Sequence, residues 1–186
     1  MVSTTGCVKQ AVLENDVRNA QWKARVLATQ VDLELAQAAA SAALVELEAL
    51  YQRAPDDKRV TALLTDGFAR LADGFIEAQR LEAVVAGDVA ETATQAQRQA
   101  DARARSAYYR KQLGKRDGKA APQPSLALLE PARDACRKRE RARYETELSA
   151  LLSASATQPE ERLQLALAQR QARFWLLPKL SQRCGF

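Results

Sequence analysis

The chain contains no histidine, and this narrows the chemistry that its side chains could carry out. Hydrolysis by a serine or cysteine nucleophile normally uses a neighbouring histidine as the base, and the common zinc sites use histidines or closely spaced cysteines. The three cysteines match no such spacing, and no glycine-rich phosphate-binding loop occurs. We therefore expect no catalytic residue, no metal ion and no cofactor.

Carboxylates are the remaining candidates for acid–base chemistry. Asp66 and Asp73 are seven residues apart on one expected helix. A catalytic acid and base must be positioned against a substrate by further groups, and the sequence identifies none here. We interpret both as solvated acids beside a helix contact.

The first of the three cysteines, Cys7, follows Thr5 and Gly6. Thr-Gly-Cys resembles the end of a bacterial lipoprotein signal, in which the cysteine is lipidated after cleavage. Thr4 stands where leucine is usual, and no apolar signal core precedes it, so this interpretation requires an export signal outside the given sequence. The alternative is an ordinary thiol near a frayed N-terminus.

The other two cysteines, Cys136 and Cys184, form an even pair if the protein is exported to an oxidising periplasm. Helices expected over 126–152 and 159–178 would pack as an antiparallel hairpin, which brings the start of one near the end of the other. The sequence therefore predicts a disulfide between them. Two buried free thiols are the competing expectation.

The composition and the periodicity predict an all-α fold, because no stretch alternates apolar and polar residues as a strand does. About six helices are expected; Gly87 ends the third of them, and the stretch 114–125, with two glycines and two prolines, is the one linker that the sequence indicates. The helices span 8–30, 31–54, 57–86, 88–113, 126–152 and 159–178. The regions are an N-terminal tether (1–20), a helical core (21–113), a linker (114–125) and a C-terminal helical hairpin on the core (126–186).

The third helix contains two interior glycines, Gly67 and Gly74, although each costs about 1 kcal/mol relative to alanine. Both fall on its apolar seam, and Phe68 and Phe75 lie one residue further round. We therefore expect both glycines to face a close contact with a neighbouring helix. The two phenylalanines, with Tyr108 and Tyr109 of the fourth helix, are candidates for lining an apolar ligand cleft, and plain core packing is the alternative.

Basic residues are concentrated in the second half of the chain. Residues 1–100 contain 10 Lys/Arg and 14 Asp/Glu, whereas residues 101–186 contain 18 Lys/Arg and 9 Asp/Glu. A basic segment such as 103–143 could contact nucleic acid. Acidic residues interrupt it, however, and no known reader motif appears. We therefore expect no nucleic-acid partner.

The segment around Pro55 suggests helix–turn–helix repeats of the tetratricopeptide type. The surrounding sequence resembles one particular protein family more closely. The stretch "DLELAQAAASAALVELEALYQRAPDDKRVTALLTDGFARLADGFIEA" and the later "ADARARSAYYRKQL" resemble the T-component (TatT-like) family associated with tripartite ATP-independent periplasmic (TRAP) transporters. The resemblance covers residues 31–113 and does not extend to the C-terminal third.

This resemblance implies a tetratricopeptide-like array of helical hairpins in a periplasmic lipoprotein anchored through Cys7. It implies a non-enzymatic scaffold that forms homotrimers, partners the solute-binding component of a transporter and has an apolar cleft. The alternatives are a ligand-free adaptor of the envelope or, if the lipoprotein-like segment is accidental, of the cytoplasm.

Overall fold

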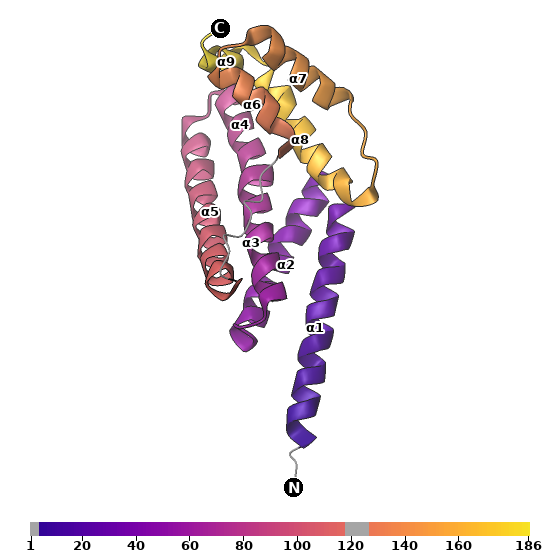
Figure 1. The fold of residues 1–186 in the computed structure, drawn as a ribbon. Helices are drawn as coiled ribbons and strands as arrows, with labels where there is room; N and C mark the ends of the chain where they lie inside the picture. Colours follow the sequence, from indigo (N-terminus) through magenta and orange to yellow (C-terminus); the bar gives the residue numbers. More distant parts are fainter. Residues whose placement is uncertain (1–3, 118–126) are drawn as a thin grey trace.

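A computed structural model describes residues 4–117 and 127–186, with side chains described for 10–115 and 127–186. The described residues form helices and no strands, which confirms the all-α prediction. Figure 1 shows a long first helix, α1, whose N-terminal half extends away from the other helices, and C-terminal helices gathered at the opposite end of the molecule. The helices are α1 (Thr4–Ala28), α2 (Leu33–Arg53), α3 (Lys58–Arg70), α4 (Glu77–Ala86), α5 (Val89–Asp117), α6 (Glu130–Arg137), α7 (Arg141–Ser153), α8 (Arg162–Trp175) and α9 (Pro178–Ser181).

The first three helices are separated by short turns with aspartate caps. Asp32 accepts hydrogen bonds from the backbone N–H groups of Glu34 and Leu35 at the start of α2. Asp57 caps α3 in the same way, and the chain turns at Pro55 between the two helices. These caps satisfy N–H groups that have no partner within their own helix.

The expected helix over 57–86 is continuous but not uniform. Between α3 and α4 it contains a π-helical turn, η1 (Leu71–Ile76), where the N–H of Glu77 bonds to the carbonyl of Ala72, five residues earlier. Gly87, with φ +80°, ends α4 as predicted. Asp88 then accepts a hydrogen bond from the N–H of Glu91, and α5 returns antiparallel along α3 and α4 (Figure 1).

The C-terminal third departs from the two expected helices. The helix expected over 126–152 is interrupted after α6, where Arg139 has φ +58° and the N–H of Glu140 bonds to the carbonyl of Ala135. The helix expected over 159–178 comprises a 3-10 turn, η3 (Pro159–Glu161), then α8, with α9 and a second turn, η4 (Gln182–Cys184), beyond it. The prediction of about six helices is therefore too low, because single predicted helices are divided.

Two regional predictions also need correction. The tether expected over 1–20 belongs to α1 from Thr4 onward, and residues 1–3 lie outside the described residues. Residues 114–117 of the expected linker belong to α5, which continues to Asp117, and residues 118–125 lie outside the described part. Cys7 lies within α1, but its side chain is not among those described.

The core consists of two main apolar clusters. One lies between α2, α3 and α5 and includes Leu64, Phe68 and Tyr109. The other joins the C-terminal helices to the π-helical turn and includes Phe75 and Leu167, which are almost completely buried. Helix α8 contacts α2 and α4, so the C-terminal helices pack directly on the preceding ones.

Candidate functional site

An open groove of about 1230 Å³ lies between α1, α2 and α3. Apolar side chains with large exposed fractions line it: Trp22 is 58% exposed and Leu35 57%. Large apolar side chains that remain in water beside one another commonly mark a binding surface. The groove is therefore the candidate functional site.

Small side chains give the groove its width. The wall formed by α1 carries Ala20, Ala24 and Ala28, four residues apart, and α2 contributes Ala39 and Ala43. Residues four apart lie on the same face of a helix. Alanines at these positions leave space between the helices that larger side chains would fill.

Ion pairs connect α1 to the helices opposite. Lys23 of α1 lies 2.6 Å from Glu46 of α2, and Asp16 lies 3.0 Å from Arg53. Glu14 pairs with Arg59 of α3 through two hydrogen bonds of 2.8 Å, and this arginine lowers the pKa of the Glu14 carboxyl. These ion pairs supplement the apolar contacts that Leu13, Val17 and Ala20 of α1 make with the neighbouring helices.

Two charged residues of α3, Asp66 and Arg70, also line the groove. Desolvation by neighbouring atoms raises the pKa of the Asp66 carboxyl, and the positive charges of Arg70 and Arg110 oppose this shift. Burial lowers the pKa of the Arg70 guanidinium, and Asp66 opposes that shift. Arg70, which is half-buried, is therefore less solvated than an ordinary surface charge, whereas Asp66 remains exposed.

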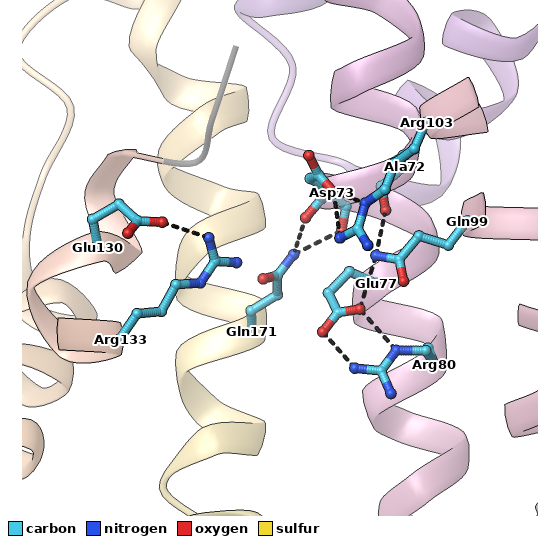
Figure 2. Close-up of polar contacts among 10 residues, drawn as sticks. Ala72, Asp73, Glu77, Arg80, Gln99, Arg103, Glu130, Arg133 and Gln171 are labelled. Atoms are coloured by element: carbon cyan, nitrogen blue, oxygen red, sulfur yellow. Dashed lines mark hydrogen bonds and ion pairs between the residues drawn. The ribbon is translucent and has the colours of Figure 1, made fainter. Parts of the chain in front are cut away.

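Polar side chains from two helices bind the π-helical turn (Figure 2). Gln171 of α8 is fully buried, and its Nε2 donates hydrogen bonds to the carbonyls of Asp73 (2.6 Å) and Gly74 (3.0 Å). Gln99 of α5 donates to the carbonyl of Ala72 and to Glu77. A π turn changes the register of the helical hydrogen bonds, and these amides bind carbonyls within it.

The two interior glycines lie at close helix contacts, as the sequence predicts. A Cβ atom at Gly67 would be 2.7 Å from Leu44 of α2, and one at Gly74 would be 2.8 Å from Leu167 of α8. Gly67 also borders the groove. The two sites thus position α3 and the π turn against different neighbours.

The aromatic residues expected to line a cleft do not line this groove. Phe68, Phe75 and Tyr109 are at most 6% exposed and pack in the core, where the Phe68 and Tyr109 rings stack with centroids 5.9 Å apart. Tyr108 is exposed on α5. Burial raises the pKa of Tyr109 to about 12, and its hydroxyl donates a hydrogen bond to Glu48. The core interpretation of Phe68, Phe75 and Tyr109 therefore replaces the cleft interpretation.

The two carboxylates considered for acid–base chemistry are in different environments. Asp73 forms an ion pair of 2.7 Å with Arg103 of α5, whereas Asp66 borders the groove. No group of three or more potential metal ligands occurs among the described residues.

Cys136 and Cys184 are joined by a disulfide, with Cα atoms 4.9 Å apart. The bond connects the end of α6 to η4 close to the C-terminus. Phe186 packs against the ring of Tyr144 beside it, with centroids 5.3 Å apart. The disulfide prediction is therefore confirmed, and the alternative of two buried free thiols is not.

No protein-family model, curated protein sequence or solved structure matches the chain. Family membership is therefore not shown. Within the described residues, no helix has the length and apolarity required to cross a membrane.

Sequence reasoning missed most of the groove. Two signals were available: the apolar residues of the first helix, including Trp22 and Val26, have ragged spacing, and α2 carries apolar residues around most of its circumference. An apolar residue outside the main seam, such as Leu35, indicates a second apolar face. Periodicity alone could not place α1 and α2 beside each other with space between them.

Proposed function

We propose that this chain is a non-enzymatic binding protein whose groove holds an elongated apolar ligand. The observation that carries the proposal is the groove itself, with exposed Trp22, Val26 and Leu35 along α1 and α2. Clefts lined by apolar and aromatic side chains with a few polar groups are the usual form of small-molecule sites.

The finer architecture that we propose is a tetratricopeptide-like array of hairpins. The antiparallel pair α2 and α3, with Pro55 in its turn and Gly67 against Leu44, supports this proposal, as does the return of α5 along α3. Together with the resemblance of residues 31–113, it suggests a homotrimeric scaffold that partners the solute-binding component of a TRAP transporter in the periplasm.

Blocking the groove is expected to abolish ligand binding without unfolding the protein. Ala39 is an exposed residue of the α2 wall, so Ala39→Trp places an indole in the groove. We expect the affinity for diphenylhexatriene, a neutral elongated apolar probe, to fall by about tenfold or more, because the indole occupies the space of the probe. Titration of probe fluorescence measures this loss.

Ala38→Trp is the matched control, because Ala38 is also exposed on α2 but does not border the groove. It should leave both the probe affinity and the melting temperature unchanged. Equal binding by the two variants and the original protein, or no binding by any of them, would contradict the proposed groove function. The second result would favour a ligand-free adaptor.

The proposed anchor and partner are tested by expressing the gene with its genomic upstream region. The protein should enter the membrane fraction with a lipid on Cys7, and Cys7→Ala should leave it soluble. The purified protein should elute as a trimer and bind the solute-binding protein encoded with the neighbouring transporter genes. A genome that encodes no such transporter would overturn the partner proposal without affecting the groove.

A further inference from the structure

The charge of Arg70 has no direct partner in the described structure. Its guanidinium borders the groove and is half-buried, yet it forms no hydrogen bond or ion pair with any described residue. Its neighbours along the same face of α3 include Leu63 and Gly67. Partial burial of an unpaired charge is unfavourable unless another group satisfies it.

The other cations of the groove differ from Arg70. Lys23 and Arg53 are engaged by carboxylates across the groove, at 2.6 and 3.0 Å. Arg25 projects from α1 with an exposed side chain. Arg70 is thus a partly desolvated cation on an otherwise largely apolar surface.

The groove is lined by equal numbers of acidic and basic residues, but only Asp66 acts on Arg70, and it does so without a direct contact. Asp66 interacts with both Arg70 and Arg110 at longer range, and neither arginine forms an ion pair with it. The Nε atom of Arg110 is buried without a hydrogen-bond partner. Asp66 is therefore shared electrostatically between two arginines and does not pair directly with Arg70, so the Arg70 guanidinium can still bind a further anion.

We propose that Arg70 binds the anionic head group of a single-chain amphiphile, whose hydrocarbon chain lies along the apolar walls of α1 and α2. A carboxylate matches the two-pronged donor geometry of a guanidinium and can form paired hydrogen bonds with it. This inference rests on the proposed groove function and adds the charge and chemical class of the ligand.

The decisive comparison uses laurate and lauryl alcohol, which carry the same chain and differ in the charge of the head group. Trp22 borders the groove, whereas Trp175 packs against Tyr144 elsewhere, so Trp22 emission in a Trp175→Phe background reports binding. We expect the protein to bind laurate about tenfold more tightly than the alcohol, because a charge-assisted bond to Arg70 forms only with laurate.

Arg70→Met should bind the two ligands equally, with an unchanged affinity for the alcohol. Arg25→Met removes one positive charge from the same groove and should retain the preference for laurate. Asp66→Asn should strengthen the preference, because it removes the negative charge beside Arg70. Thermal melting of each variant verifies that it is folded. If Arg70→Met does not fold, the preference of Asp66→Asn for laurate provides the second test.

The outcomes separate this inference from the function on which it rests. Equal affinity of the unmodified protein for both ligands would overturn the role of Arg70 and leave the apolar groove intact. An equal loss of preference in Arg25→Met and Arg70→Met would overturn it as well, because it would indicate general attraction rather than a specific site. Failure to bind either ligand or diphenylhexatriene would overturn both proposals.

Discussion

Removal of the Cys136–Cys184 disulfide is expected to lower the free energy of unfolding by about 4 kcal/mol, the largest effect that we predict. The bond joins residues 48 apart, and its loss releases a long loop in the unfolded chain. It also fastens the segment that ends in Phe186 to α6. Denaturant unfolding of the double variant Cys136→Ser/Cys184→Ser, compared with the oxidised protein, measures the change.

Intact-mass analysis after alkylation under denaturing conditions establishes whether the bond is present. Protein from an oxidising compartment should take up alkylating reagent at these two positions only after reduction. Cys7→Ser is the matched control, because it removes a thiol outside the disulfide and should not change the stability. Alkylation of Cys136 and Cys184 without reductant would show that the prediction is wrong.

Gly74→Leu is expected to lower the free energy of unfolding by more than the usual cost of overpacking, which is about 1–3 kcal/mol. A Cβ atom at Gly74 would lie only 2.8 Å from Leu167, which is fully buried on α8. The larger side chain must displace α8 from the π turn, where Gln171 also binds the backbone. Thermal and denaturant unfolding measure the loss.

A second substitution tests the stated cause of this effect. In Gly74→Leu/Leu167→Ala, the shortened partner should restore part of the stability that Gly74→Leu removes, so the two changes should not be additive. Ala38→Leu adds volume at an exposed site of α2 and serves as the control. Unchanged melting of Gly74→Leu would exclude a close contact at this position.

Several helix boundaries could be predicted because they depend on local chemistry. Gly87 ends α4 with a positive φ that glycine adopts without strain, and Asp88 caps α5. Asp57, two residues after Pro55, caps α3 in the same way.

Other features depend on contacts between distant segments and could not be predicted. The π turn is bound by Gln99 and Gln171, which lie on α5 and α8. The break between α6 and α7 places Arg139 at φ +58°, an uncommon conformation for arginine, next to Gly185 at the far end of the chain. No local pattern marks either position.

The candidate site also combines features that the sequence predicts with features that depend on tertiary packing. The sequence predicts the glycine contacts, because Gly67 and Gly74 fall on a clear seam. It does not indicate which aromatic residues face a cavity, since a buried Phe68 and a ligand-lining one have the same periodicity. The groove depends on the position of α1 relative to α2, which tertiary packing determines.

The attachment of α1 makes the groove sensitive to ionic strength. Among the described side chains of this helix, Val17 alone is fully buried, whereas Glu14, Asp16 and Lys23 connect it to its neighbours through ion pairs. The Debye length falls from about 10 Å at 0.1 M salt to about 3 Å at 1 M, so salt weakens exposed pairs of this kind. We therefore expect high salt to favour local opening of α1, so that one wall of the groove separates while α3, with its larger buried face, stays in place.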